Sequence, residues 1–192
     1  TGFERSTETL KVRYERFNRP PEPVIFASPS VWPTGWRDAA ALLAWIVAVM
    51  AAGATMGVLF GPDGWYATLQ KPTWNPPNWL FGPVWTALYA LMGVGCWLIS
   101  REPGPAAATE RRKAWWAFAL QAVLNLAWTP LFFGLRSPGL AFIDIMLLWL
   151  AALWMTIAFG RVRPMAGYLQ LPLLAWISFA LLLNGTIWLM NT

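Results

Sequence analysis

Five long runs of apolar residues divide the chain, and short stretches rich in proline, glycine or charge separate them. Each run is close to the roughly 20 residues that an α-helix needs to cross a bilayer core. The runs lack the polar face that a helix on the surface of a soluble protein presents to water. Because backbone groups in lipid must satisfy their hydrogen bonds internally, the pattern predicts an all-α membrane protein, a bundle of five transmembrane helices. The expected helices cover about residues 39–60, 79–100, 114–133, 138–160 and 168–190.

The connection between the first two runs is stiff and aromatic. Its prolines, Pro72, Pro76 and Pro77, fix their own φ and push each preceding residue toward extended geometry, so the loop has little freedom to lose. Tryptophan and tyrosine side chains surround it: Trp65, Tyr66, Trp74 and Trp79. Two interpretations stay open. One is an aromatic belt at the membrane–water boundary, and the other is a preformed lid over a cavity between the helices.

Residue spacing predicts which helix faces point into the bundle, because residues three or four apart share a face. In the second helix this spacing aligns Phe81, Trp85, Tyr89, Met92 and Cys96. In the third helix it aligns Gln121, Asn125, Trp128 and Phe132. In the fifth helix it aligns Trp176, Ala180, Leu183, Asn184, Trp188 and Asn191. Amides in hydrocarbon need partners, so the Gln121 face should point inward, and we expect Gln121 to form an interhelical hydrogen bond.

Small residues and two unusual residues interrupt the apolar helices. Gly53 and Gly57 have the small-xxx-small spacing that lets helices approach closely in lipid; we expect packing within the chain, with a dimer seam as the alternative. Pro130 should kink the third helix one turn before its end. Asp144 is the only acid within an apolar run. It lies about two turns from Arg136, within reach of an interfacial basic group or a helix end, so we interpret it as structural.

Composition narrows the possible chemistry. The chain has 15 tryptophans among its 192 residues and no histidine. The usual haem ligand, metal ligand and general base are therefore missing. The single Cys96 excludes a disulfide within the chain. Glu102 and Glu110 flank a loop and form no acid pair. We therefore expect a protein that is not an enzyme, with no catalytic residues, no metal site and no obligatory cofactor.

Basic residues predict the orientation in the membrane. Of the 14 lysines and arginines, only Lys71 and Arg136 fall in the connections on the side of the proline-rich loop. The other twelve lie before the first helix and after the second and fourth. Because basic residues stay on the cytoplasmic side, the N-terminus should be cytoplasmic, with a bacterial inner membrane as the expected location. The positive net charge then reflects topology and gives no reason to expect nucleic-acid binding.

Residues 1–37 differ in composition from the transmembrane domain expected over residues 38–192. Five prolines keep much of this arm extended, and residues 10–17 fit either a short strand or a helical face. Ordering such an arm costs about 1–2 kcal/mol per residue in backbone freedom, and the short loops of a small bundle offer little surface to offset that. We expect a partner chain to hold the arm, with loose adsorption on anionic lipid as the alternative.

Three stretches resemble one known family. The segment WYATLQKPTWNPPNWLFGPVWTALYALMG, residues 65–93, resembles the first-loop and second-helix signature of the translocator protein family, also called tryptophan-rich sensory proteins or peripheral-type benzodiazepine receptors. The third-helix pattern of that family is matched by Gln121, Asn125, Trp128, Pro130, Phe132 and Phe133. The fifth-helix pattern is matched by Pro172, Trp176, Phe179, Ala180, Asn184, Trp188 and Asn191. The resemblance covers roughly residues 39–191.

The resemblance implies a five-helix bundle with an ordered lid loop that binds a tetrapyrrole such as a porphyrin. The implied role is sensing, transport or regulation of pigment and tetrapyrrole metabolism. A flat aromatic ligand suits a pocket of indole rings with a few polar donors. Without histidine, a metal-free tetrapyrrole is favoured. The residues expected to bind it are Trp74, Phe81, Trp85, Tyr89, Asn125, Trp128, Trp176, Ala180, Leu183 and Asn184.

The resemblance has one clear departure and leaves two rival functions open. Gly185 and Leu189 stand where the cholesterol-recognition pattern of animal members has an aromatic and a basic residue, so we do not expect cholesterol as the ligand. One rival is an enzyme that degrades the pigment in a light-dependent reaction. The other is a structural subunit of a larger membrane complex, such as a photosynthetic pigment–protein assembly, held through the arm. A homodimer is also compatible with the sequence.

Overall fold

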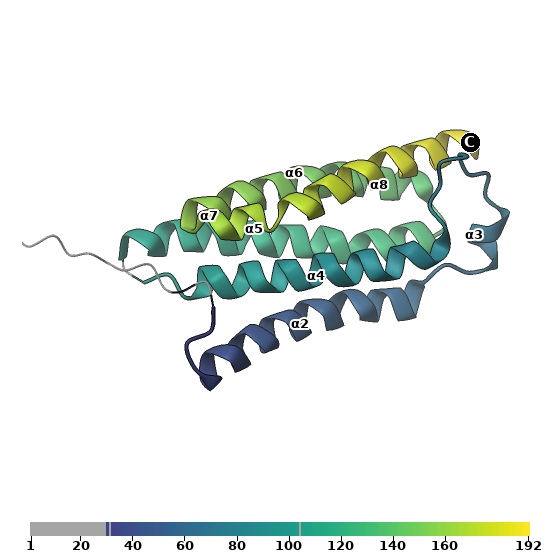
Figure 1. Ribbon diagram of the computed structural model, residues 1–192. Coiled ribbons are helices and arrows are strands. Elements are labelled where there is room, and N and C mark those ends of the chain that lie inside the picture. Colours follow the sequence, from purple (N-terminus) through teal and green to yellow (C-terminus); the bar gives the residue numbers. More distant parts are fainter. Residues whose placement is uncertain (1–29, 31, 104) are drawn as a thin grey trace, which may run out of the picture.

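The described part of the chain is a bundle of long helices that run side by side (Figure 1). The computed structural model describes residues 30, 32–103 and 105–192. The elements are α2 (Trp36–Phe60), α3 (Gly64–Thr68), α4 (Asn78–Ser100), α5 (Pro105–Thr129), η1 (Pro130–Gly134), α6 (Pro138–Val162), α7 (Pro164–Tyr168) and α8 (Leu171–Met190). Five segments are long and apolar enough to cross a membrane, which confirms the predicted five-helix architecture. The predicted arm lies mostly outside the described residues and stays a prediction.

The helices extend beyond the apolar runs that predicted them. The third helix begins at Pro105 rather than near Ala114. Hydropathy marks only the part of a helix that suits lipid, whereas alanine and long charged residues continue a helix into the polar zone. The fifth span is broken, because α7 ends at Tyr168 and α8 begins at Leu171. At Pro130 the third helix does change geometry and continues as the π-helix η1.

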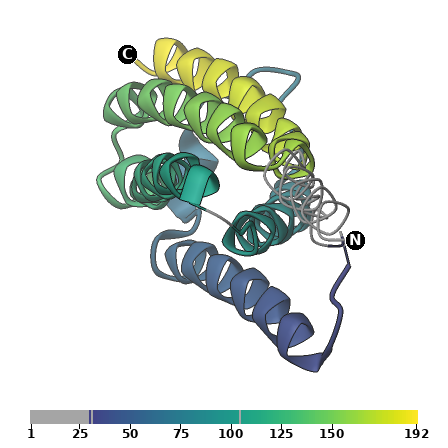
Figure 2. The same ribbon diagram turned by 90° about the vertical axis from the view of Figure 1, so that its left-hand side faces the viewer.

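Helix α2 lies on the outside of the bundle, where it packs mainly on α4 (Figure 2). Gly93 of α4 makes the close contact possible, since a Cβ there would lie 2.6 Å from the Cα of Ile46. Nearer the C-terminal end of α2, the two helices also meet at Gly53, where a Cβ would lie 2.0 Å from Cε2 of Tyr89. Gly57 has no neighbour within 4 Å of such a Cβ. The predicted close packing therefore holds for Gly53 and is wrong for Gly57.

Ion pairs and a hydrogen bond connect elements at the end of the bundle that lies opposite α3. Arg101 pairs with Asp38 at 2.8 Å, and the indole Nε1 of Trp97 donates to the same carboxylate at 3.1 Å. The Arg101 guanidinium also lies over the Trp97 ring, 4.4 Å from its centroid. Glu102 pairs separately with Arg163 at 3.3 Å. These contacts fix the start of α2 and the loop after α4 to the rest of the bundle.

Two polar side chains in the spans do not form the bonds expected of them. Arg136 pairs with Asp63 at 2.9 Å rather than with Asp144. Within the described residues, Oδ2 of the buried Asp144 has no hydrogen-bond partner. Gln121 does point inward and is fully buried, but neither side-chain polar atom finds a partner in the described part of the chain. The expected interhelical bond from Gln121 is therefore wrong.

Candidate functional site

A cavity of about 700 Å³ lies between α2, α4, α5, α6 and α8, beneath the loop that joins α2 to α4. Most of its wall is apolar. Large side chains on α4, η1 and α8 hold the helices apart here, whereas on α2 small residues leave room: Ala51, Gly53, Ala54 and Gly57. The bundle is therefore hollow toward the loop end, because the sequence places bulky rings on one wall and glycine and alanine on the other.

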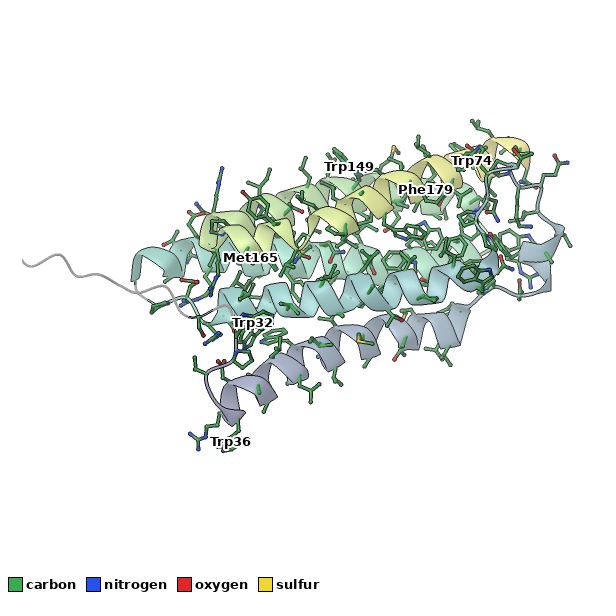
Figure 3. All side chains as sticks on the ribbon, viewed as in Figure 1. Trp32, Trp36, Trp74, Trp149, Met165 and Phe179 are labelled. Carbon is green, nitrogen blue, oxygen red and sulfur yellow. The ribbon has the colours of Figure 1, made fainter. Side chains whose placement is uncertain are left out.

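Nine of the ten residues expected to bind ligand line this cavity. They are Phe81, Trp85, Tyr89, Asn125, Trp128, Trp176, Ala180, Leu183 and Asn184. Trp74 does not line it. Its ring lies in the loop, about half exposed, and packs edge-on against Phe179 of α8 with 5.8 Å between ring centroids (Figure 3). Farther along the predicted α8 stripe, Trp188 packs on Phe142 and also lies outside the cavity.

Ring pairs hold the aromatic wall in place. Trp85 stacks on Tyr89 within α4, with centroids 5.2 Å apart, and Trp128 stacks on Phe132 at 5.0 Å. Across the cavity, Phe81 of α4 meets Trp176 of α8 edge to face at 5.9 Å. Each stacked pair orients one ring through its neighbour, so the wall presents ring faces that are fixed before any ligand binds.

Hydrogen bonds engage some of the polar groups in the wall. The Trp128 indole donates to Oδ1 of Asn184 at 2.9 Å, and Nδ2 of Asn184 donates to the Pro138 carbonyl at 2.8 Å. These two bonds tie α5, α8 and the start of α6 together. The Tyr89 hydroxyl donates to Oδ1 of Asn125 at 2.8 Å. Nδ2 of Asn125 is buried and has no partner among the described residues.

The loop between α2 and α4, residues 61–77, covers one end of the cavity and is called the lid below. Its helix α3 is capped by Asp63, whose carboxylate accepts from the backbone N–H of Trp65 at 3.0 Å. Tyr66 is buried on the cavity side, where its ring meets Phe132 and Phe133. Burial raises the pKa of Tyr66, so its phenol stays neutral. The structure thus favours the lid interpretation of this loop over a simple belt.

Two polar contacts fasten the lid to other parts of the bundle. Asn191, just past the end of α8, forms two hydrogen bonds with the backbone of Gln70. Its Oδ1 accepts from the Gln70 N–H at 2.9 Å, and its Nδ2 donates to the Gln70 carbonyl at 3.0 Å. Asp63 pairs with Arg136 in the loop before α6. Desolvation raises the pKa of Asp63, but the Arg136 bond and charge and the Tyr66 and Trp65 amides outweigh it and hold that pKa below its usual value.

Sequence reasoning missed the α2 wall and Tyr66. Met50, Ala54 and Gly57 line the cavity from α2. The four-residue spacing of Gly53 and Gly57 did indicate a face of small residues on the first helix. Such a face serves equally for close helix contact and for leaving space, so the spacing alone did not predict a cavity wall. Tyr66 was recognised as part of the aromatic loop, and only the fold of the lid shows that its ring points inward.

The sequence also matches known proteins. The sequence pattern of the TspO/MBR family matches residues 40–189. The chain belongs to the TspO/MBR family. It is 44% identical to the human translocator protein over 125 residues, 65% of this chain and 73% of the relative. It is 43% identical to the tryptophan-rich protein TspO of Chlorobaculum tepidum over 132 residues, 68% and 82% of the two chains. The tryptophan-rich sensory protein of Cereibacter sphaeroides is 37% identical over 147 residues, 75% and 87%.

This family membership confirms the resemblance carried by the three sequence motifs. The matched residues include the lid, all five candidate spans in part, and each residue that lines the cavity. The membrane location follows from the same membership together with the five apolar helices. The arm before residue 40 lies outside the match.

Proposed function

We propose that this TspO/MBR protein binds a tetrapyrrole, such as a metal-free porphyrin, in the cavity beneath the lid and serves in sensing, transport or regulation of tetrapyrrole metabolism. The observation that carries the proposal is a wall of fixed indole and phenyl faces around the cavity. Flat aromatic molecules gain most from such faces. The lid supplies a cover that shields them from water.

The size and polarity of the cavity support this class of ligand. Its volume of about 700 Å³ falls within the roughly 300–1,000 Å³ of pockets that enclose drug-sized molecules. Most of the lining is apolar, with a few polar side chains that include Asn125 and Asn184.

The proposal is tested by titrating the purified protein with a free-base porphyrin and following porphyrin absorbance. Trp176→Ala removes a ring from the cavity wall and should weaken binding by roughly 1–3 kcal/mol, the scale of aromatic–base stacking. Trp116→Ala is the matched control, because that ring is 67% exposed on the outside of α5. Equal affinities in both variants and the unaltered protein would overturn the proposed site.

Binding and catalysis are separated by a second measurement on the same complex. A carrier or sensor should release the porphyrin unchanged after illumination. Light-dependent loss of the porphyrin spectrum, with a new product in stoichiometric excess over protein, would instead assign a degrading enzyme. Wild-type protein and the Trp176→Ala variant are compared so that photobleaching of free porphyrin is subtracted.

We further propose that the N-terminus and the loop between α4 and α5 face the cytoplasm, with the lid on the opposite side. The support is the asymmetry of basic residues, of which only Lys71 and Arg136 fall on the lid side. Cys96 is the single cysteine of the chain. A Cys96→Ser variant therefore gives a cysteine-free protein into which single cysteines can be introduced for labelling. A membrane-impermeant reagent should reach cysteine at position 71 and position 112 from opposite sides. Labelling of both from one side would overturn this topology.

A further inference from the structure

The residues that line the cavity beneath the lid differ in exposure from one side of the bundle to the other. On α5, η1, α6 and α8, every described lining residue is buried or half-buried. Exposed lining residues lie only on α2, on α4 and in the lid between them. The cavity therefore opens sideways between α2 and α4. We call this opening the side mouth; it is bordered by Val47, Ala51, Ala54 and Gly57 on α2 and by Gly82 and Thr86 on α4.

The side mouth lies level with the apolar part of the membrane. Val47 is near the middle of α2, which is one of the candidate spans, and Gly57 is close to its lid end. Small residues border the mouth from both helices, and a Cβ on Gly57 or Gly82 would meet no atom within 4 Å. Because the mouth extends from the lid toward the middle of a span, lipid hydrocarbon rather than water faces it.

The cavity offers no cation to a ligand. Among the described residues that line it, none is an acid or a base. The basic residues on the lid side are engaged elsewhere. Lys71 donates to the Leu69 carbonyl at 3.0 Å and lies over the Tyr66 ring, and Arg136 pairs with Asp63. Moving a carboxylate from water into such a site is costly, so a neutral ligand is favoured.

We propose that the cavity takes neutral tetrapyrroles that are esterified with a long hydrocarbon tail. The ring lies beneath the lid, and the tail leaves through the side mouth into lipid. This inference rests on the proposed function for the position of the ring and adds the class of ligand. Esterification removes the carboxylate charge that the cavity cannot offset. The tail stays in hydrocarbon throughout, so it needs no pocket of its own.

The other sides of the cavity leave no comparable outlet for a tail. Phe81 and Trp176 meet edge to face between α4 and α8. The indole of Trp128 is hydrogen-bonded to Asn184 between α5 and α8. From the lid, the buried Tyr66 lines the cavity. Small, exposed residues border the cavity only between α2 and α4 in the described part of the chain, so the tail is assigned to that side.

The test compares three metal-free chlorins that share one ring: pyropheophorbide a, which has one carboxyl group, its methyl ester and its hexadecyl ester. Binding to the full chain in lipid nanodiscs is followed by quenching of tryptophan fluorescence. Each affinity is referred to the ligand concentration in the lipid, which is measured with empty nanodiscs. We expect the two esters to bind equally well and the acid to bind about tenfold more weakly, because its carboxylate finds no cation in the cavity.

The contrary results are distinct from one another. A hexadecyl ester that binds much more weakly than the methyl ester would show that the tail has no outlet and would overturn the proposal. An acid that binds as tightly as the esters would overturn it too, because a cation must then meet the carboxylate. Trp176→Ala should weaken all three chlorins alike and tests the proposed function separately. If none of the three binds, both the proposed function and this inference are wrong.

A variant and a labelled tail locate the outlet. Ala54→Phe narrows the side mouth from α2 and should weaken the hexadecyl ester about tenfold more than the methyl ester, since added bulk is poorly tolerated in a filled space. Ala44→Phe is the matched control, because Ala44 is exposed on α2 and does not line the cavity. Equal effects of Ala54→Phe on the two esters would overturn the proposal.

If Ala54→Phe does not fold, the unaltered protein gives the answer through a hexadecyl ester with a diazirine in the tail, close to the ester group. Photolabelling should fall on residues 47–57 of α2 or 78–86 of α4, which border the side mouth. An excess of the methyl ester should remove that labelling, because the two ligands share the ring site. Labelling that the methyl ester does not displace, or displaceable labelling of other segments alone, would overturn the proposal.

Discussion

The half of the bundle away from the lid and the half beneath it use the same helices in opposite ways. Away from the lid, small residues bring backbones together: a Cβ on Gly93 would meet Ile46 at 2.6 Å, and a Cβ on Gly167 would meet Gly160 at 2.7 Å. Beneath the lid, Phe81 of α4 and Trp176 of α8 meet ring to ring and keep their helices apart. One half is a packed core and the other encloses a cavity of about 700 Å³.

The difference shows that a glycine in a membrane helix can serve either close packing or open space. Gly93 and Gly57 are both glycines in apolar spans, yet the first lies against a neighbouring backbone and the second has open space before it. Packing between spans depends on close contact, since lipid leaves little hydrophobic drive for helix association. The packed half therefore carries much of the stability, which allows the other half to enclose a cavity.

The largest expected effect comes from adding volume to the packed half. Gly93→Val would force α2 away from α4, because the atoms it meets are backbone atoms of Ile46 and Trp45 that cannot rotate aside. We expect a loss of stability of about 1–3 kcal/mol or more, the usual cost of overpacking. Thermal unfolding in nanodiscs measures it. A melting temperature equal to that of the unaltered protein would contradict the packed-half assignment.

The matched substitution in the hollow half should lower porphyrin affinity and leave stability intact. Gly57→Leu points a side chain into the cavity, where a Cβ meets nothing within 4 Å. Stability should stay the same or rise, while porphyrin affinity should fall about tenfold or more, equivalent to ~1.4 kcal/mol. Porphyrin titration beside thermal unfolding separates the two effects. Loss of stability without loss of affinity would show that Gly57 belongs to the packing and not to the cavity.

The sequence was sufficient for the five spans and for most of the cavity wall, because both depend on periodicity. The four-residue spacing of Phe81, Trp85 and Tyr89 places them on one face, and that face does line the cavity. The ends of helices were less predictable: α5 begins at Pro105 because helix propensity continues where hydropathy stops. Such differences arise because hydropathy marks where a helix prefers lipid, and a helix can begin before that point.

What the sequence could not supply is which groups meet across helices. Asn184 was expected as a polar donor for ligand, and its amide is instead engaged by Trp128 and Pro138 from two other elements. Gln121 was expected to find a partner, and the described chain provides none. Trp74 seemed part of the site from its place in the loop, but it packs against Phe179 and does not line the cavity. These outcomes depend on three-dimensional neighbours that spacing along one helix does not specify.

A smaller effect is expected where the lid is fastened to the hollow half. Asn191→Ala removes both bonds to the Gln70 backbone. Each such bond contributes about 0.5–1.5 kcal/mol net, so bound porphyrin should dissociate several-fold faster with little change in thermal stability. Thr192→Ala is the control, since among the described residues that hydroxyl donates to the Leu189 carbonyl at its own helix end. An unchanged dissociation rate would mean that the lid does not limit release.

The smallest expected effect is a pH dependence of lid order through Asp63. This carboxylate caps α3 and pairs with Arg136, and its pKa lies below the usual value of 3.8. A group with a lowered pKa stabilises the folded lid fully above its unfolded pKa and loses that contribution as pH falls through the folded value. The pair is largely exposed, so salt should weaken it as well. The measurement is hydrogen exchange at the Trp65 and Tyr66 amides, with Asp63→Asn at the same pH as the reference that cancels intrinsic exchange rates. The unaltered protein should show extra protection at pH 6. That extra protection should vanish at pH values below the usual pKa range of a carboxyl group. A protection ratio that stays constant over that range would show that lid order depends on the Asn191 contact and the Tyr66 packing rather than on the charge.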